Sequence, residues 1–326
     1  MSSFADEQPD LREQPGSPPL ARNAVDRAAF RRTDDAWLAT AWSDGLVIIV
    51  DLAAGGRALV TDHPDGGSAL VLRPSAEAPE AERWFLGIDT EGTALWAMDA
   101  ALPEVSDTRA VTLREIGHLL GDRDTGIFTE AAALANWHAS HRYSPRNGQL
   151  TTVVEAGWAR RDADGKLMWP RTDPAMIVLV HDGVAGPEGC CLLGHNAAWP
   201  PGAAGVRRFS CLAGYVEPGE SAEAAVVREV GEEVGVRPGS LRYAGSQSWP
   251  YPGSLMLGFH AVADKDQPLR LDPAEIDEAH WFSREAVAKM IAGVYVHPET
   301  GVRMSLPTPS SIAFYLIERW LGGFTQ

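Results

Sequence analysis

Residues 214–236 read GYVEPGESAEAAVVREVGEEVGV, and this stretch decides the fold. Ser221 can accept a hydrogen bond from an early backbone N–H, so it predicts the start of a helix, and the glycine near the end predicts its C-terminus. Between them, Glu229, Glu232 and Glu233 stand at spacings i, i+3 and i+4. We therefore predict that their three carboxylates project from one helix face.

The three glutamates point to a divalent cation. Like-charged pairs at this spacing destabilise a helix by about 0.2–0.5 kcal/mol each, and a cation relieves that repulsion. Mg²⁺ and Mn²⁺ prefer oxygen ligands and leave positions open for phosphate and water. Arg228 can hold one carboxylate by a bidentate contact and orient the others. For the glutamates alone, a solvated acidic helix would be the simplest explanation, but the complete pattern arises by chance at about 1 in 10⁸ start positions.

The residues reproduce the Nudix box: Gly, five residues, Glu, seven residues, Arg-Glu-aliphatic, one residue, Glu-Glu, one residue, Gly-aliphatic. The chain therefore resembles a Nudix hydrolase. The resemblance implies an α/β/α sandwich with a mixed sheet. It also implies that a nucleoside diphosphate linked to another group is cleaved with Mg²⁺ or Mn²⁺.

A second segment, SQSWPYPGS at 246–254, narrows the substrate. Its prolines stiffen a turn, so that Trp249 and Tyr251 become rigid aromatic faces for a planar heterocycle, and Gln247 can hydrogen-bond an amide or a base edge. Without context, an aromatic turn that fills the core would be an equal alternative. In this place the segment resembles the SQPWPFPxS signature of the NADH pyrophosphatases, with Ser248 and Tyr251 where proline and phenylalanine are usual.

The resemblance covers most of the chain after about Leu134 and implies the reaction: NAD(H) and water give nicotinamide mononucleotide and AMP. The implied metal ligands are Glu229, Glu232, Glu233, Glu275 and the carbonyl of Gly214. Either Glu233 or Glu275 deprotonates the attacking water, and Glu220 and Arg228 hold the loop and helix in register. The substrate contacts are expected from Tyr215, Gln247, Trp249, Tyr251, Trp169 and Ala313.

Two alternatives remain open from the sequence. The same residues could remove the NAD cap from RNA 5′ ends, because the bond is the same. A non-catalytic sensor of NAD or ADP-ribose is the other alternative, although no glutamate of the box is missing. Hydrolysis of ADP-ribose is disfavoured by the aromatic turn.

Four segments are expected along the chain. Residues 1–22 are predicted to form a disordered tail, because they are rich in Pro, Ser, Asp and Glu. Residues 23–133 are predicted to form a small mixed α/β domain. Residues 134–169 form a ribbon-like connector and residues 170–326 the Nudix domain.

Many relatives carry a zinc ribbon in the connector. Here Ser144 and Asn147 stand at the first cysteine pair, and RRDADGK at 160–166 contains no cysteine. Neither residue supplies the thiolate that zinc prefers, and His138 and His141 lack further ligands nearby in the sequence. We predict a connector without zinc that is stabilised by Trp158, Trp169, Tyr143 and hydrogen bonds.

Composition excludes several other functions. With 28 basic and 44 acidic side chains the formal net charge is −16, which argues against a general nucleic-acid binder. Three cysteines cannot form a disulfide framework, so a reducing cytoplasm is expected. The N-terminus lacks the pattern of a secretory signal, and no apolar run is long enough to cross a bilayer. The resemblance further implies a homodimer.

Overall fold

The computed structural model describes residues 16–200, 202 and 205–323. The chain divides into two compact units. The C-terminal unit comprises Asp173–Gln247 and Ser254–Gln326, and the N-terminal unit comprises Met1–Thr172 together with Ser248–Gly253. The tip of one hairpin of the Nudix-like part therefore belongs to the N-terminal unit.

The C-terminal unit is built on a mixed sheet with the strand order β15-β16-β11-β12-β17, in which β14 also pairs with β11. Strand β16 runs parallel to β11, whereas β12 and β14 run antiparallel to it. The strands are β11 (Asp173–His181), β12 (Cys190–Asn196), β14 (Leu212–Tyr215), β15 (Leu241–Trp249), β16 (Ser254–Val262) and β17 (Ile276–Ser283), with a small parallel pair β13 (Arg207–Arg208) and β18 (Met304–Ser305). The helices are α4 (Ala222–Val234), α5 (Arg284–Ile291) and α6 (Ile312–Leu321).

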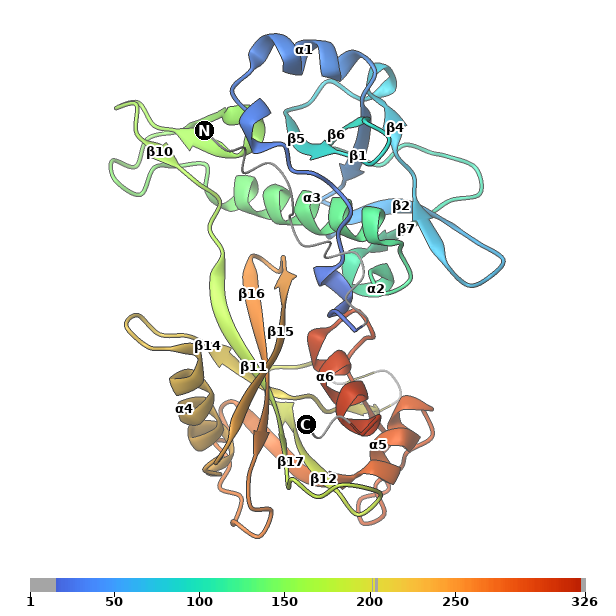
Figure 1. Cartoon of the computed structure of the whole chain (residues 1–326), viewed down its shortest axis with the longest axis vertical. Coiled ribbons are helices and arrows are strands. Elements are labelled where there is room, and N and C mark those ends of the chain that lie inside the picture. Colours follow the sequence, from blue (N-terminus) through green and yellow to red (C-terminus); the bar gives the residue numbers. More distant parts are fainter. Residues whose placement is uncertain (1–15, 201, 203–204, 324–326) are drawn as a thin grey trace, which may run out of the picture. The chain divides into compact units, whose positions relative to one another are not determined.

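Strand β11 shows why this sheet is covered on both faces. Successive side chains of a strand point to opposite faces. Met176 and Val178 pack into the cluster that contains Val226 and Val230 of α4. Ile177 and Leu179, which point to the opposite face, pack into the cluster that contains residues of α5 and α6. Figure 1 shows α4 on one side of the sheet and α5 and α6 on the other, so the expected α/β/α sandwich is confirmed.

The N-terminal unit contains a four-stranded sheet of order β4-β1-β6-β5 and a three-stranded sheet of order β3-β2-β7. A further three-stranded sheet, β10-β9-β8, forms the connector. The helices are α1 (Asp35–Ser43), α2 (Leu113–Ile116) and α3 (Asp122–Ser140). The strands are β1 (Leu46–Val50), β2 (Arg57–Asp62), β3 (Ser68–Leu70), β4 (Arg73–Pro74), β5 (Arg83–Ile88), β6 (Ala94–Asp99), β7 (Arg109–Thr112), β8 (Thr152–Val154), β9 (Ala159–Arg161) and β10 (Leu167–Met168).

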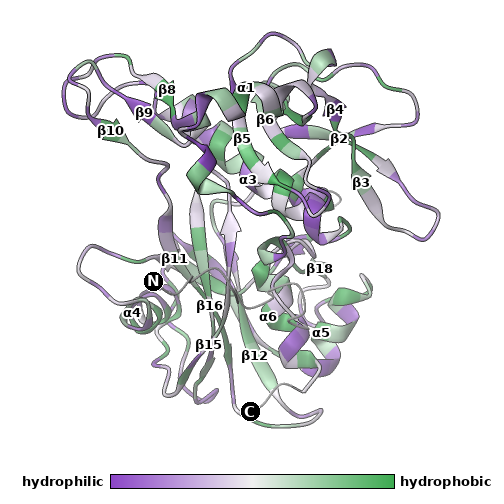
Figure 2. Cartoon of the chain, turned by 45° about the horizontal axis from the view of Figure 1, so that its top comes forward, coloured by the Kyte–Doolittle hydropathy of each residue, from purple (hydrophilic) through white to green (hydrophobic). Residues whose placement is uncertain are grey.

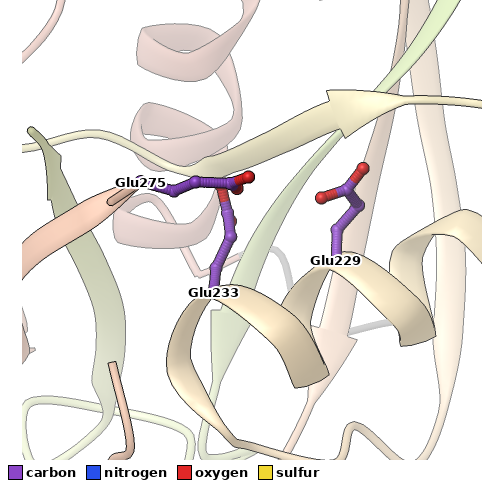
Figure 3. A group of neighbouring side chains, drawn as sticks. All are labelled: Glu229, Glu233 and Glu275. Atoms are coloured by element: carbon purple, nitrogen blue, oxygen red, sulfur yellow. The ribbon is translucent and has the colours of Figure 1, made fainter. Parts of the chain in front are cut away.

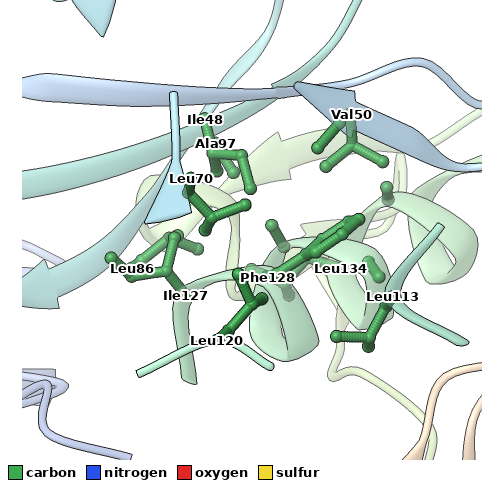
Figure 4. Close-up of a cluster of buried hydrophobic side chains, with 14 of the residues drawn as sticks. Ile48, Val50, Leu70, Leu86, Ala97, Leu113, Leu120, Ile127, Phe128 and Leu134 are labelled. Atoms are coloured by element: carbon green, nitrogen blue, oxygen red, sulfur yellow. The ribbon is translucent and has the colours of Figure 1, made fainter. Parts of the chain in front are cut away.

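The core of the N-terminal unit follows the same alternation. Ile48 and Val50 of β1 pack with Phe128 and Leu134 of α3 (Figure 4). Val47 and Ile49 point to a second cluster with Leu38 of α1. Figure 2 shows that β5 is largely hydrophobic, whereas β9 in the connector is largely hydrophilic. This unit is therefore the mixed α/β domain that was expected.

Two of the expected segment boundaries are wrong. The tail was predicted to extend to residue 22, but Pro19–Ala21 form a 3₁₀ helix and Leu20 is buried in the core. Arg22 donates to the carbonyls of Gly117 and Leu120, which fixes this segment. Residues 1–15 lie outside the described part of the chain. The connector begins at about residue 141 rather than 134, because α3 continues to Ser140.

Hydrogen bonds link the two connector loops in which no zinc site was predicted. Ser144, which is buried, donates from Oγ to Asp162 Oδ2 at 3.1 Å, and Asn147 donates from Nδ2 to Asp164 Oδ2 at 2.9 Å. The other oxygen of Asp162 accepts the backbone N–H groups of Asp164 and Lys166. These oxygen and amide groups are engaged with one another and do not offer a thiolate site.

The aromatic residues of the connector differ in their roles. Trp158 donates from Nε1 to the carbonyl of Phe85 at 2.7 Å, and the guanidinium of Arg32 lies 3.5 Å from its ring centroid. Tyr143 and Trp169 were expected to stabilise the connector as well, but they are 63% and 62% exposed. That expectation is wrong for these two residues, because an exposed ring contributes little burial. In the described residues, no helix combines the length and apolar character needed to cross a membrane.

Candidate active site

Helix α4 is positioned by its two ends. Ser221 accepts at Oγ from the backbone N–H of Ala224 at 3.1 Å, which caps the first turn. Gly235 follows the last turn with φ 71°, the left-handed conformation that glycine adopts most readily. Because α4 buries its Ala and Val face against the sheet, Glu229 and Glu233 are held at the edge of that packed face.

Three carboxylates meet beside α4. Ligand oxygens of Glu229, Glu233 and Glu275 all lie within 4.8 Å of one another. Glu229 and Glu233 are one helical turn apart on α4, and Glu275 directly precedes β17 (Figure 3). This grouping joins two parts of the C-terminal unit that are distant in sequence.

The loop that carries Glu275 is fixed to the end of α4. The backbone N–H of Arg270 donates to Val234 O at 2.9 Å, and that of Asp272 donates to Glu233 O at 3.1 Å. These bonds satisfy carbonyls that the helix terminus leaves free. Glu275 then donates its own N–H to Asp272 O at 3.0 Å. Asp272, which sequence reasoning did not single out, therefore helps to place Glu275, and no spacing rule within the box could have indicated it.

Glu232 lies outside the carboxylate group. Its side chain is 60% exposed and pairs with Arg228 Nη1 at 3.0 Å. The sequence predicted that it would share one face with Glu229 and Glu233, but the structure places Glu275 in that group instead. Glu232 and Glu233 are adjacent in sequence and therefore point in different directions around the helix axis. The guanidinium of Arg228 attracts the Glu232 carboxylate away from the other two.

Arg228 connects most of the acidic residues of the box. It donates from Nε and Nη2 to the two oxygens of Glu220, at 2.9 Å each. Its Nη1 lies 2.9 Å from Glu229 Oε1, and its Nη2 donates to Tyr215 O at 2.9 Å. Such bidentate, charge-assisted contacts fix both partners. The Arg228 hydrogen bonds also lower the pKa of Glu220.

Burial gives the carboxylate group an unusual electrostatic state. Burial, together with the charges of Glu229, Glu275 and Glu232, raises the pKa of Glu233 to about 8. Burial also raises the pKa of Glu229, although Arg228 acts in the opposite direction. Glu233 Oε2 is buried without a hydrogen-bond partner among the described residues. A hard divalent cation would satisfy this oxygen and offset the repulsion, so the donor set fits Mg²⁺ or Mn²⁺.

Gly214 leaves the space that Glu229 occupies. A Cβ atom at position 214 would lie 2.0 Å from Glu229 Oε1 and 2.1 Å from its carboxyl carbon. No larger residue fits there unless the carboxylate moves. This close approach explains the glycine at the start of the box, while the role of its carbonyl as a metal ligand stays a prediction.

Four of the six expected substrate residues form an exposed pair and a buried pair. Tyr215 is 56% exposed, with its hydroxyl 3.2 Å from Ser254 Oγ, and Trp169 is also exposed. By contrast, Gln247 is 1% exposed and donates from Nε2 to Ser310 O at 3.0 Å. Ala313 is buried in the cluster with α5 and α6. The structure therefore does not support direct substrate contacts by Gln247 or Ala313, because packing covers both.

The aromatic turn is held in the N-terminal unit. Trp249 and Tyr251 are half-buried, with ring centroids 5.2 Å apart and planes at 65°. Trp249 packs against the core cluster of that unit. The Arg114 guanidinium lies near both rings, a contact that the sequence did not indicate because Arg114 is far from the turn along the chain.

Two family profiles match separate parts of the chain. The sequence profile of the NUDIX domain matches residues 171–299. The profile described as an NADH pyrophosphatase-like rudimentary NUDIX domain matches residues 50–137. Among solved structures, the NUDIX domain of Shewanella oneidensis NrtR, complexed with ADP ribose, is 16% identical, with a TM-score of 0.35, and covers 49% of this chain and 90% of that one.

Curated relatives are similar over nearly the whole chain. The chain is 39% identical over 313 residues to a protein named NAD-capped RNA hydrolase NudC from Mycobacterium tuberculosis, covering 93% of this chain and 94% of the relative. It is 35% identical over 215 residues to NAD-capped RNA hydrolase NUDT12 from Pongo abelii, covering 62% of this chain and 43% of that relative.

Proposed function

Because the chain belongs to the NudC/NADH pyrophosphatase family of Nudix hydrolases, we propose that it hydrolyses the pyrophosphate bond of NAD(H) to nicotinamide mononucleotide and AMP. The observation that carries this proposal is the group of Glu229, Glu233 and Glu275, tied to the rest of the box by Arg228. These three carboxylates offer the oxygen ligands that a divalent cation prefers. The capped helix α4 holds two of them in place.

The residues of the site would divide the work. Glu229, Glu233 and Glu275 would hold Mg²⁺ or Mn²⁺, which when bound supplies charge neutralisation and a more acidic water. Arg228 and Glu220 keep the loop before α4 and the helix in register. Glu233 and Glu275 are both candidates for the group that accepts a proton from the attacking water, since both face the same point.

The test is release of AMP from NADH by the purified protein. We expect turnover with Mg²⁺ or Mn²⁺, its loss on chelation and its return when the cation is restored. Glu229→Gln keeps the side-chain size but removes the charge, so it should lower turnover strongly without unfolding the protein. Binding of NADH without any turnover would instead support the non-catalytic sensor.

A second candidate is removal of the NAD cap from RNA. The relatives carry this activity in their names, and residues 141–172 contain six Arg or Lys but three Asp or Glu, in a chain that is strongly acidic. Arg142, Arg161 and Lys166 have exposed side chains in this connector. Such cations attract an RNA backbone.

Competition between NADH and NAD-capped RNA in one assay separates the two substrates. Reversing the connector charges with Arg142→Glu, Arg161→Glu and Lys166→Glu should slow turnover of the RNA and leave NADH turnover unchanged. A matched control changes the net charge equally at Arg237, Lys265 and Lys289, outside the connector. Equal effects of both triple variants on the RNA would count against a role for the connector.

We also propose, from the family resemblance, that two copies of the chain associate and that the enzyme works in the cytoplasm. Light scattering after gel filtration tests the first, and a single-chain mass would contradict it.

A further inference from the structure

The turn at Ser248–Gly253 lies at the tip of the β15–β16 hairpin but is packed within the N-terminal unit. Both of its aromatic rings are half-buried there, and Trp249 contacts the core cluster of that unit. A turn that is expected to contact substrate is therefore supported by residues far from the carboxylate site in sequence.

Two residues of the N-terminal unit hold this turn by hydrogen bonds. Asn136 of α3 donates from Nδ2 to the carbonyl of Pro250 at 2.7 Å, which fixes the main chain between the rings. Arg114 of α2 donates its backbone N–H to Tyr251 Oη at 3.1 Å. Together these bonds hold the carbonyl of Pro250 and the hydroxyl of Tyr251.

The guanidinium of Arg114 also lies against both rings. Its carbon is 4.3 Å from the Tyr251 centroid and 5.0 Å from the Trp249 centroid. A cation over a ring face is attracted by the ring quadrupole and occupies that face. An aromatic ring has two faces, so Arg114 can orient the Trp249 ring while the opposite face receives a planar base.

Tyr251 has a different role from Trp249. Its hydroxyl is engaged by Arg114, its ring packs edge-on against Trp249, and burial raises its pKa. These contacts hold Tyr251 in place within the turn. The family signature has phenylalanine at this position, which has the same ring but lacks the hydroxyl.

We propose that Arg114 and Asn136 are positioning residues for substrate binding, which hold the 248–253 turn so that Trp249 stacks on a planar base of the dinucleotide. Tyr251 anchors the turn and does not contact substrate. The inference rests on the proposed function and gives the N-terminal unit a role in substrate affinity.

The test compares Arg114→Gln and Asn136→Asp with the unaltered enzyme, using NADH and Mn²⁺. Arg114→Gln removes the cation from the rings, and Asn136→Asp replaces the donor to Pro250 with an acceptor. We expect KM to rise about tenfold in each, while kcat stays within about twofold, because stacking on a base is lost without change at the carboxylates. A variant that merely unfolds in part would lose kcat and keep its KM.

A double-mutant cycle shows whether Arg114 acts through Trp249. Trp249→Ala alone should raise KM at least as much as Arg114→Gln, and the double variant should match Trp249→Ala, because the ring to be oriented is gone. Effects that multiply in the double variant would overturn the proposal.

Arg83→Gln is the matched control. The guanidinium of Arg83 lies 4.2 Å from the Trp42 centroid and 5.6 Å from that of Trp96 in the same unit, but not at the turn. Arg83→Gln should leave KM unchanged.

If the unaltered protein does not hydrolyse NADH, the proposed function fails. If it does, and both Arg114→Gln and Asn136→Asp keep their KM, only the present inference fails.

Discussion

At the scale of single residues, the site depends on which carboxylates meet. Glu233 is buried among other acidic groups, whereas Glu232 is exposed and paired with Arg228. A residue's place in a motif therefore does not determine its distance from the reacting atoms. We therefore expect substitutions of Glu232 and Glu233 to lower turnover to different extents.

Glu233→Gln should lower kcat for NADH by about 100-fold or more, because it removes a charge from the centre of the site. Glu232→Gln should cost far less, since its carboxylate points to Arg228 and solvent. Rates of AMP release at saturating Mn²⁺ compare the two variants. Equal losses would mean that Glu232 enters the site during turnover.

Gly214→Ala tests the close approach of the β14 backbone to Glu229. The added methyl would force the Glu229 carboxylate to move, because it would lie 2.0 Å from Oε1. We expect turnover to fall about tenfold or more through the misplaced ligand. The thermal unfolding midpoint should change little, since the carboxylate can swing aside. Ala213→Gly, one residue away on the same strand, is a control for backbone effects.

His138 predicts a pH dependence of stability. Its Nε2 bonds to Gly157 O and its Nδ1 faces Arg160 Nη1, each at 2.9 Å, so the neutral ring fits as a donor and an acceptor. Burial lowers the pKa of His138 from 6.5 to about 4. The unfolded chain thus binds more protons between these values, and the free energy of unfolding should fall by about 3 kcal/mol as the pH drops from 6.5 to 4.

Denaturant titrations of His138→Gln check this pH dependence. Glutamine can donate and accept but does not titrate, so the slope between pH 6.5 and 4 should decrease. The exposed His63 provides the control, because His63→Gln should leave the slope unchanged. An unaltered slope in His138→Gln would show that other groups cause the acid sensitivity.

At the scale of secondary structure, caps and alternation account for most elements. The predicted helix after Ser221 forms as expected, because its cap and the period of its buried side chains both agree with tertiary packing. The apolar segment 35–42, DAWLATAW, forms part of α1 and not a strand. Asp34 accepts at Oδ1 from Trp37 N at 3.1 Å, an N-cap that the apolar composition concealed.

What the sequence could not supply are contacts between distant segments. Glu275 joins Glu233 only because the loop after α4 bonds to its last carbonyls. Arg114 reaches Tyr251 only through the packing of the N-terminal unit. Local spacing predicted Glu229 and Glu233 as neighbours, but it carries no information on such long-range pairs.

Ser221→Ala tests the cap of α4. Loss of the hydroxyl that accepts from Ala224 N should lower the free energy of unfolding by about 1 kcal/mol. Ser221→Thr keeps an acceptor and should recover most of this loss. Urea denaturation of the three proteins measures the difference, and equal values for Ser221→Ala and the unaltered protein would show that water replaces the cap.

At the scale of the whole molecule, the connector holds together without thiolates. Asp162 accepts hydrogen bonds from Ser144 Oγ and from the backbone of Asp164 and Lys166. We expect purified protein to carry substoichiometric zinc and to keep its melting temperature after treatment with a strong zinc chelator.

Asp162→Ala separates this hydrogen-bond network from metal binding. Since it removes the link from Ser144 and leaves only that from Asn147 to Asp164, it should lower the melting temperature where the chelator does not. Glu104→Ala, at an exposed position of the N-terminal unit, serves as a control for loss of one carboxylate. Stoichiometric zinc by elemental analysis, or a chelator-sensitive transition, would contradict this description.

The same oxygen-based link between the connector loops has a physiological consequence. Peroxide oxidises thiolate ligands, which then release their metal. A fold that depends on that metal is lost as well. Carboxylate, hydroxyl and amide groups have no such chemistry. We therefore expect this connector to keep its structure during oxidative stress and metal starvation, so that turnover of its substrate would continue when a thiolate-dependent counterpart stops.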